Sequence, residues 1–384
     1  MRFSVDAHAI GQHLTGNETY VRNLLNCFAT LDQEADFITY LSREDAFIDV
    51  PQRFLKRRVA VNPFVRLGFD LPRRLRQDRP HLLHVQYTAP VFCSTPIVVS
   101  VHDVSFLEHP GYFAPFRALQ LRCTVSRTVK SAARVIAPSE FSKRRILSSY
   151  RLDEDKVVVL PNGVASAFRP MPRESAQRWV HSSFGLCAPF ILTVGDLQPR
   201  KNHVGLIGAF EKLMRAHPQL PHQLVIVGKE NWRASTVRAA AKRSSVADRI
   251  HFTGFVSDEG LLRLYGACDL FAYPSFYEGF GLPILEAMAC GRAVACSNTS
   301  AMPEVADSAA ILFDPNSEDE IALAMRDLLL NPELRQRMER LGMQRAATFS
   351  WEGTAGKTLD LYYAVAGEAN RTPASAMRTI SAGH

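Results

Sequence analysis

The sequence predicts an α/β protein made of two doubly wound, Rossmann-like domains that face each other across a cleft. Its 384 residues suffice for two domains with separate cores, and 47% hydrophobic with 22% charged residues is a globular composition. Strand-like and helix-like segments alternate through both halves, which indicates parallel sheets covered by helices on both faces. One stretch rich in proline, asparagine and glycine, Leu160–Pro172, interrupts the alternation and is the predicted linker.

The first predicted domain, 1–170, contains short buried strands and two clear helices. The first helix is amphipathic, with apolar residues at helical spacing from Tyr20 to Phe28. The second, Ser139–Tyr150, begins with a serine whose hydroxyl suits the N-cap position. The strands of this domain are predicted at Arg2–Val5, His81–Val85, Pro96–Val101 and Arg134–Ala137.

The second predicted domain, 171–350, repeats the same alternation. Its strands are predicted at Phe190–Val194, Leu224–Val227, Ile250–Phe252 and Leu270–Tyr273. Its helices are predicted at His203–Ala216, Pro283–Ala289, Ser317–Leu330 and Pro332–Ala347. One more amphipathic helix, 351–366, follows this domain, and the stretch 367–384 is predicted to be a flexible tail because it is rich in Ser, Thr, Ala and Gly.

Two adjacent cations, Arg200 and Lys201, lie where the strand Phe190–Val194 gives way to a helix, in a turn that opens with Gly195. Ligands of doubly wound sheets bind at the carboxyl ends of strands, and a helix N-terminus there offers free N–H groups to an anion. Arginine and lysine together suit a diphosphate, whose charge they would balance without a metal. An ordinary solvated loop, with Asn202 as the helix N-cap, is the alternative interpretation.

A second cluster follows the strand that ends at Tyr273. Glu278 precedes a turn containing Gly279 and Gly281, which let the backbone approach a ligand closely. Glu286 lies in the first turn of the next helix, so both carboxylates can face one cavity and accept hydrogen bonds from sugar hydroxyls. The N–H groups of Phe280, Gly281 and Leu282 are predicted to point into the same cleft. Alternatively, Glu286 merely complements the helix dipole.

In the first half, His102 and Asp103 come directly after the strand Pro96–Val101, a position that faces the cleft. His102 is therefore a candidate for contact with a sugar hydroxyl or the reacting region, and Asp103 for orienting that histidine or meeting an acceptor. A purely structural histidine is the competing interpretation. Gly16, in the loop that opens the first helix, is a further candidate for contact with a phosphate or an acceptor.

Taken together, these clusters resemble family 4 of the retaining glycosyltransferases, which have the two-Rossmann GT-B architecture. The resemblance spans about Met1 to Val365, and its most specific part is the pair Glu278 and Glu286 with Arg200-Lys201 upstream. The matching stretches are VHDVSF, APSEFSKRRI, PNGV, ILTVGDLQPRKN, RIHFTGFVSDEGLLRLYGACDLFAYPSFYEGFGLPILEAMACG, PEV and LFDP.

The resemblance implies a role for each matching residue. Arg200 and Lys201 would hold the donor diphosphate, Glu278 with the Gly279 to Leu282 amides the transferred sugar, and Glu286 the ribose. Phe255 and Val256 would contact the base, and His102 would lie near the sugar. The helix 351–366 would cross back onto the first domain. The sequence departs from the family pattern at GNETY in the first loop and at Asp307, where glycine is common.

On this basis the expected activity is retaining transfer of a hexose from a nucleotide sugar to a glycan or lipid-linked saccharide, as in polysaccharide biosynthesis. The donor is expected to be GDP-mannose, with no metal and no cofactor. An epimerase or hydrolase of nucleotide sugars with the same architecture is one alternative. A non-catalytic basic binding module is the other, although the sequence shows no nucleic-acid-binding signature.

The charge distribution and the N-terminal sequence predict where the protein is located. Up to Pro170 there are 23 Lys and Arg against 16 Asp and Glu, so this half carries the whole net charge of +7. An anionic membrane surface is therefore a candidate partner, with scattered solvated charge as the alternative. The N-terminus lacks a signal-peptide pattern and no apolar run is long enough to span a bilayer, so a cytoplasmic or peripheral inner-membrane location is expected. Seven scattered cysteines predict buried thiols rather than disulfides or zinc.

Overall fold

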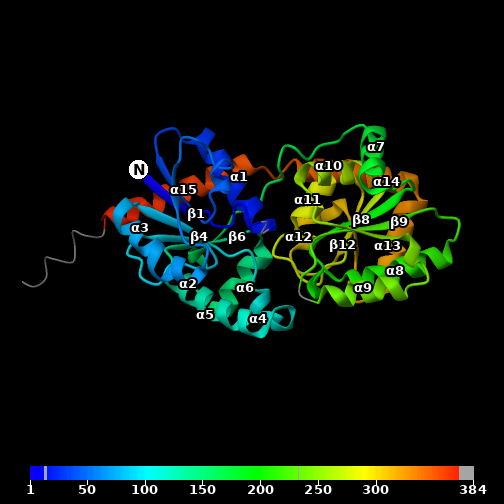
Figure 1. Cartoon of the computed structure of the whole chain (residues 1–384), viewed down its shortest axis with the longest axis horizontal. Helices are drawn as coiled ribbons and strands as arrows, with labels where there is room; N and C mark the ends of the chain where they lie inside the picture. The colour runs from blue at the N-terminus through cyan, green and yellow to red at the C-terminus, as the bar shows by residue number, and fades with distance from the viewer. Residues whose placement is uncertain (13–14, 232, 372–384) are drawn as a thin grey trace, which may run out of the picture.

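The computed structural model describes residues 1–12, 15–231 and 233–371. It contains two parallel sheets, each flanked by helices on both faces, so the predicted fold class is confirmed (Figure 1). Across the described residues, every helix falls short of the length and apolar character that a membrane span requires.

The N-terminal sheet has seven parallel strands in the order β3-β2-β1-β4-β5-β6-β7. Their bounds are β1 Arg2–Asp6, β2 Asp36–Leu41, β3 Leu55–Arg58, β4 Leu82–Gln86, β5 Ile97–Ser100, β6 Arg134–Ala137 and β7 Val157–Val159. The helices of this half are α1 Thr15–Leu31, α2 Pro63–Val65, the π-helix η2 Arg66–Asp70, α3 Leu71–Asp78, α4 Ser105–Glu108, η3 Pro110–Tyr112, α5 Pro115–Ser131 and α6 Glu140–Tyr150.

The C-terminal sheet has six parallel strands in the order β10-β9-β8-β11-β12-β13. Their bounds are β8 Phe190–Val194, β9 Gln223–Val227, β10 Ile250–Gly254, β11 Leu270–Tyr273, β12 Val294–Ser297 and β13 Ile311–Phe313. Its helices are α7 Arg173–Phe184, the 3-10 turn η5 Pro199–Lys201, α8 His203–Ala216, α9 Ala234–Arg243, α10 Asp258–Ala267, α11 Leu282–Ala289, α12 Met302–Ala306, α13 Glu318–Leu330 and α14 Pro332–Ala346.

Both sheets reverse their strand order once, and these points locate the ligand crevices. In the first sheet the reversal lies between β1 and β4, and in the second between β8 and β11. Loops that leave two neighbouring strands in opposite directions open a crevice at their carboxyl ends, where doubly wound proteins bind ligands. The loops that carry Arg200-Lys201 and Glu278 follow β8 and β11, so they border the crevice of the second sheet.

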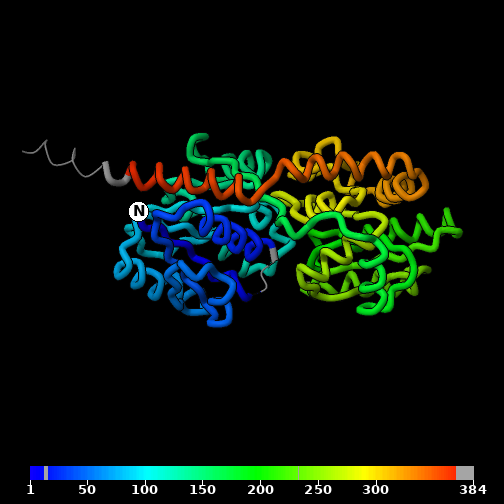
Figure 2. Tube along the Cα trace, turned by 90° about the horizontal axis from the view of Figure 1, so that it is seen from above, coloured from blue at the N-terminus to red at the C-terminus, as the bar shows by residue number. Residues whose placement is uncertain are grey.

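The last helix, α15 Trp351–Arg371, leaves the C-terminal half and lies along the N-terminal sheet (Figure 2). It contributes Trp351, Ala355, Leu359 and Tyr362 to the hydrophobic core of the N-terminal half, where they pack with Phe3 and other residues of α1 and β1. The predicted crossing helix is therefore confirmed. It is longer than predicted, because it runs through Gly367 to Arg371, where a tail was expected; residues 372–384 lie outside the described residues.

Several other elements differ from the sequence predictions. The strands β2, β3, β7, β12 and β13 and the helix α7 were not predicted, although β7 lies just before the expected linker and α7 just after it. Pro283 occupies the second helical position of α11, because Leu282 is the first. All seven cysteines are free, as expected, but Cys123 and Cys187 are exposed rather than buried.

Candidate active site

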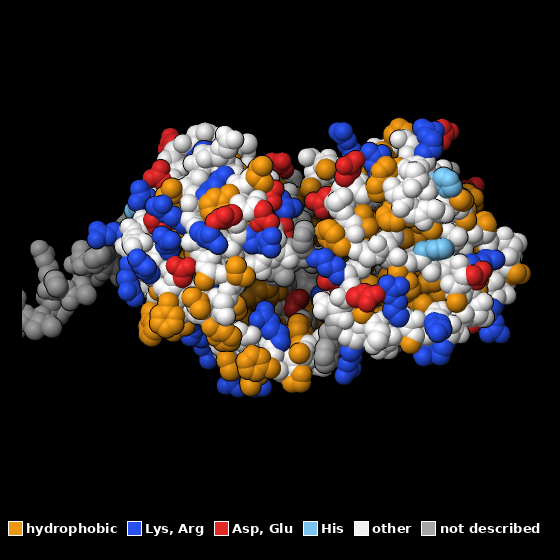
Figure 3. Space-filling view, viewed as in Figure 1, with side chains coloured by type: hydrophobic (Ala, Val, Ile, Leu, Met, Phe, Trp, Pro, Cys, Tyr) orange, Lys and Arg blue, Asp and Glu red, His pale blue; other side chains and the backbone are white. Residues whose placement is uncertain are grey.

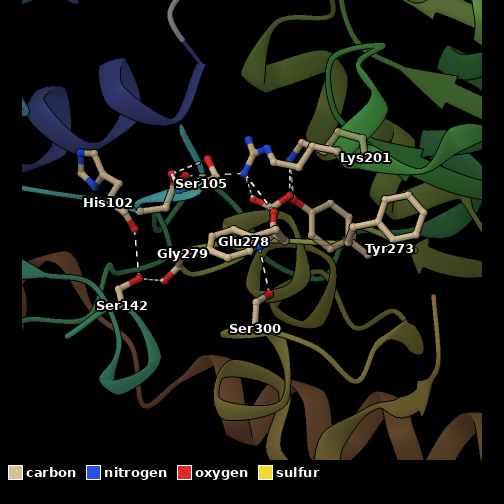
Figure 4. A network of polar contacts seen from close by, with 12 residues as sticks. His102, Ser105, Ser142, Lys201, Tyr273, Glu278, Gly279 and Ser300 are labelled. Carbon is tan, nitrogen blue, oxygen red and sulfur yellow. Dashed lines mark hydrogen bonds and ion pairs between the residues drawn. The ribbon is translucent and has the colours of Figure 1, made fainter. Parts of the chain in front are cut away.

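A compact ion cluster lies at the carboxyl ends of β8 and β11. Glu278 accepts hydrogen bonds from both predicted cations: its carboxylate oxygens lie 3.0 Å from the Arg200 guanidinium and 2.6 Å from Lys201 Nζ (Figure 4). Asp103, from the loop after β5, lies 3.6 Å from the same guanidinium. The structure therefore brings residues of three separate loops, and of both halves of the chain, into one site.

The local sequence explains why the two cations point inward. Asn202 adopts a left-handed backbone, with φ of 52°, and its side chain accepts from Gly205 N, so the chain turns sharply between η5 and α8. Gly195 leaves room for the lysine: a Cβ at this position would lie 3.1 to 3.3 Å from the Lys201 side chain. Lys201 also donates a hydrogen bond to the Tyr273 hydroxyl at 2.8 Å, which fixes the ammonium beside β11.

The electrostatics of the cluster follow from burial and mutual pairing. Burial raises the pKa of Glu278, but Arg200 and Lys201 outweigh it and lower the value to about 2. Burial lowers the pKa of a cation. Even so, Glu278 and Asp103 hold the pKa of Arg200 above its ordinary value. The pKa of Lys201 is lowered, because burial exceeds the effect of Glu278. The charges of the cations are thus balanced by the carboxylates of the site itself.

The loop after Glu278 is fixed against the N-terminal half. The hydroxyls of Ser139 and Ser142, at the start of α6, donate to the Gly279 carbonyl at 2.7 and 3.0 Å. A Cβ on Gly279 would lie 1.8 Å from the His102 carbonyl oxygen, so only glycine fits this contact. The two halves of the chain therefore meet at the Glu278 loop itself.

Main-chain groups beside the cluster are oriented for an anion. Gly281 has φ of 109° and precedes α11, whose N-terminus begins at Leu282. Among the described residues, the N–H groups of Phe280 and Gly281 have no hydrogen-bond acceptor. A helix N-terminus with free N–H groups attracts negative charge. The side chain of Phe280, by contrast, is buried against Phe349 and is not available to a ligand.

Glu286 occupies a different environment from Glu278. Its carboxylate accepts a hydrogen bond from the Tyr265 hydroxyl at 3.0 Å. Burial raises the pKa of Glu286 to about 7. No ion pair or hydrogen bond links Glu286 to Arg200, Lys201 or Glu278 among the described residues, so the cluster contains three of the four residues predicted to surround the ligand.

His102 and Asp103 do not pair in the predicted way. His102 Nε2 lies 2.8 Å from Gln86 Oε1, and its ring is directed away from Glu278 in Figure 4. Asp103 instead accepts from the N–H and hydroxyl of Ser105 and faces Arg200. The prediction that Asp103 orients His102 is wrong, because capping of the next helical turn engages its carboxylate. Burial lowers the pKa of His102 to about 4, so the imidazole is neutral at pH 7.

The remaining predicted contacts lie farther from the cluster or deeper in the fold. Gly16 lies in the first turn of α1, and a Cβ there would meet nothing within 4 Å. Phe255 is 52% exposed, and Lys229 lies over its ring at 4.7 Å. Val256 is buried in the core of the C-terminal half, so its side chain is not available to a base. Asp307 has φ of 50°, a conformation that explains why glycine suits this position.

Several residues that hold the site were not predicted from the sequence. Tyr273 was visible only as the end of a strand, and Ser142 only as part of a helix. Glu304 lies in the PEV stretch, and its carboxylate accepts the N–H groups of Glu140 and Phe141 at 2.8 and 3.0 Å. A carboxylate of α12 thus caps α6 of the other half. The sequence shows only that residue 304 is acidic and does not indicate this partner.

Chemically, the site suits an anion with hydroxyl groups nearby. Two buried cations and two free N–H groups favour a diphosphate, and Glu278 is an acceptor for hydroxyl hydrogens. Within the described part of the chain, no group of three or more His, Cys, Asp or Glu side chains is arranged to hold a metal ion.

Comparisons with known proteins relate the chain to glycosyltransferases. Residues 14–168 match the family described as Glycosyltransferase Family 4, and residues 184–345 match Glycosyl transferases group 1. The chain is 32% identical to O-antigen chain mannosyltransferase B of Escherichia coli over 267 residues, which is 69% of each chain. It is 29% identical to the serotype-specific mannosyltransferase WbdA of Escherichia coli over 65% of this chain, but spans only 31% of that larger protein.

A solved structure with a similar fold is Anabaena Alr3699/HepE in complex with UDP and glucose. Its TM-score is 0.76 at 18% identity, and the match covers 95% of this chain and all of that one.

Proposed function

The chain belongs to family 4 of the glycosyltransferases, and from that membership we propose a specific reaction. The enzyme transfers mannose from GDP-mannose to a glycan or lipid-linked saccharide, with retention at the anomeric carbon and without a metal. Two mannosyltransferases among its relatives support the choice of sugar. The complex of the Anabaena protein with UDP and glucose makes UDP-sugars the main competing donors.

The observation that carries this proposal is the pairing of Arg200 and Lys201 with one buried carboxylate, Glu278. A diphosphate entering the crevice would take over both cations, because it offers more charge and more acceptor oxygens than one carboxylate. Glu278 would then be released to accept hydrogen bonds from the hydroxyls of the sugar. The paired cations are therefore prepared for the donor, with the Glu278 carboxylate in the place that the diphosphate would take.

The same geometry indicates how transfer would proceed. The bond between the anomeric carbon and the diphosphate oxygen breaks, and the acceptor oxygen bonds to that carbon on the same face. The leaving diphosphate oxygen takes the acceptor proton, so no protein carboxylate needs to act as a nucleophile. Arg200, Lys201 and the N–H groups of Phe280 and Gly281 stabilise the charge that grows on the diphosphate. His102, whose imidazole is neutral at pH 7, does not supply a proton in this scheme.

In this scheme Glu286 would bind the ribose hydroxyls of the donor. Phe255 would contact the base at the rim of the crevice. His102 and Asp103 come from the N-terminal half, so the acceptor would enter from that side. A lipid-linked acceptor would bring the enzyme to the cytoplasmic face of a membrane.

A donor screen with two sets of variants tests the proposal. Release of GDP from GDP-mannose, and of UDP or dTDP from their hexose derivatives, is measured with and without a saccharide acceptor and with EDTA. We expect GDP-mannose to be consumed, EDTA to have no effect, and Arg200→Ala or Lys201→Ala to reduce turnover by about 10²–10³-fold. Lys212→Ala, an exposed cation of α8, is the matched control.

Binding of GDP alone provides an independent readout. Glu278→Gln is expected to bind GDP more tightly than the unchanged protein, because the diphosphate no longer has to displace a carboxylate from Arg200 and Lys201. Full turnover in the Arg200→Ala and Lys201→Ala variants contradicts the assignment. Donor consumption that needs no acceptor would instead identify a hydrolase or epimerase.

A further inference from the structure

The N-terminal half exposes large apolar side chains on one face. Figure 3 shows hydrophobic side chains gathered along its lower edge, over α2 and α5, with Lys and Arg side chains among them. Each of these side chains is 50 to 76% exposed: Phe64, Phe69, Val91, Phe92, Phe116 and Leu119. Single exposed apolar residues are common, but a group that includes four phenylalanines marks an interaction site. We call this group the apolar face.

Hydrogen bonds join the three segments of the apolar face. The N–H of Val91 donates to the carbonyl of Leu67 in η2 at 3.0 Å. On the other side, the guanidinium of Arg127 in α5 donates to the Val91 carbonyl at 2.9 Å. The loop of Val91 and Phe92 is therefore held between η2 and α5. The exposed side chains are therefore carried by neighbouring segments that hydrogen bonds hold together.

The charge on this surface has one sign along α5. This helix carries four exposed cations and no acidic residue: Arg117, Arg122, Arg127 and Lys130. Among the described residues, none of the four has a carboxylate within ion-pair distance. By contrast, the two arginines of β3 are paired with carboxylates, Arg57 with Asp78 and Arg58 with Glu44. The four unpaired cations of α5 thus lie on the same helix as Phe116 and Leu119.

We propose that the apolar face and the cations of α5 dock the protein on an anionic lipid bilayer. Aromatic rings insert at the boundary between headgroups and acyl chains, and neighbouring arginines bind lipid phosphates. A second copy of the chain fits this surface less well, because a two-fold contact would bring two cationic helices together. Docking rests on this surface alone and does not depend on the proposed reaction.

The position of the surface would serve a lipid-linked acceptor. A cavity of about 1150 Å³ opens beside α5 and is lined by Phe106, Phe113, Leu119, Arg122, Tyr150 and Arg233. Arg233 precedes α9 of the C-terminal half, so the cavity spans both halves of the chain. Leu119 and Arg122 belong to both the cavity and the docking surface. A docked enzyme would therefore keep this cavity next to the bilayer.

Vesicle co-sedimentation of the full chain tests the docking surface. The lipids are phosphatidylcholine vesicles with and without phosphatidylglycerol. We expect binding only to the anionic vesicles, and a loss of about fivefold in partitioning for each of Arg117→Gln and Arg122→Gln. The combined variant Phe69→Ser, Phe116→Ser and Leu119→Ser should lose binding while keeping its melting temperature, because all three side chains are exposed.

Matched changes elsewhere serve as controls. Ile48→Ser removes a side chain that is 89% exposed in the same half of the chain, and Lys242→Gln with Arg243→Gln removes two cations from α9. Both should bind vesicles like the unchanged protein. Phe116→Trp should show a blue-shifted emission on anionic vesicles, and Ile48→Trp should not.

Three results would overturn the proposal. They are equal binding to neutral vesicles, unaltered binding by the combined serine variant, and a self-associated dimer that this variant dissociates.

Discussion

At the scale of single residues, two glutamates only eight positions apart are placed in opposite electrostatic environments. Two cations lower the pKa of Glu278 to about 2, whereas burial beside Tyr265 raises that of Glu286 to about 7. Glu278 is therefore always ionised, and Glu286 changes protonation near neutral pH. The two carboxylates are consequently suited to different tasks, one as a permanent counterion and one as a group that ionises when hydroxyls approach.

The protonation of Glu286 predicts a specific dependence of stability on pH. Because its pKa rises from 4.5 to about 7 on folding, the folded state holds the proton more tightly. This contribution is complete below pH 4.5 and is lost as the pH rises through 7. Because of Glu286, the free energy of unfolding should fall by about 1–3 kcal/mol between pH 5 and pH 8. The Glu286→Gln variant should not show this fall.

Chemical denaturation at pH 5 and pH 8 measures this effect. The free energy of unfolding of Glu286→Gln, relative to that of the unchanged protein, should be higher at pH 8 than at pH 5. Glu174→Gln, an exposed position of α7, should show no such gain. Parallel curves for Glu286→Gln and the unchanged protein would contradict the raised pKa.

The sequence was sufficient to identify candidate site residues from their type and position along the chain. It was not sufficient to predict which residues they contact. Arg200, Lys201 and Glu278 were predicted because each follows a strand of a doubly wound sheet. Their direct pairing could not be predicted, because it depends on how β8 and β11 lie side by side. The pairing of His102 with Gln86 rather than Asp103 depended likewise on neighbouring strands, since Gln86 ends β4.

At the scale of elements, the strands that border the two crevices were predicted better than edge strands and connections. β8 and β11 are apolar runs bounded by turns, and both were predicted within one residue. β3, at the edge of its sheet, reads LKRR and has no apolar pattern. α7 follows the proline-rich linker, whose turn residues concealed the helix behind them. Tertiary pairing determines such elements, so local sequence does not reveal them.

The close contact between the Glu278 loop and the β5–α4 loop predicts that a larger residue at position 279 would move the two halves apart. A methyl group in Gly279→Ala would collide with the His102 carbonyl, a backbone atom that cannot rotate away. The two loops would have to separate, and the hydrogen bonds from Ser139 and Ser142 to the Gly279 carbonyl would break. We expect transfer activity to fall by at least about tenfold, because misplacement of a catalytic loop by an ångström is costly.

Small-angle scattering and kinetics check this expectation together. Gly279→Ala should show a larger radius of gyration than the unchanged protein. The control is Gly356→Ala in α15, where a methyl group would meet no atom within 4 Å. This control should keep its activity and gain about 0.5–1 kcal/mol in stability, because alanine favours a helix more than glycine does. Unchanged closure and activity in Gly279→Ala would show that the loops adjust without cost.

At the scale of the whole molecule, the order of residues along the chain does not follow the division into cores. α15 comes last in the sequence but completes the core of the first sheet, as Figure 2 shows. The bridge between Val164 and Ser350 brings the linker beside the start of this helix. The chain therefore passes between the halves twice at neighbouring points, which limits how far the halves can move apart.

This arrangement predicts that damage to the last helix destabilises the first half. Tyr362 is completely buried, contacts the rings of Phe3 and Phe28, and forms a hydrogen bond with His84 of β4. Tyr362→Ala should cost about 3–5 kcal/mol, because it leaves a cavity and removes the partner of His84 Nδ1. Hydrogen exchange should then accelerate in β1 and β4 but not in β8 and β11. Tyr363→Ala, at a partly exposed neighbour, should have a smaller effect. Accelerated exchange confined to β8 and β11 would contradict the assignment of α15 to the first core.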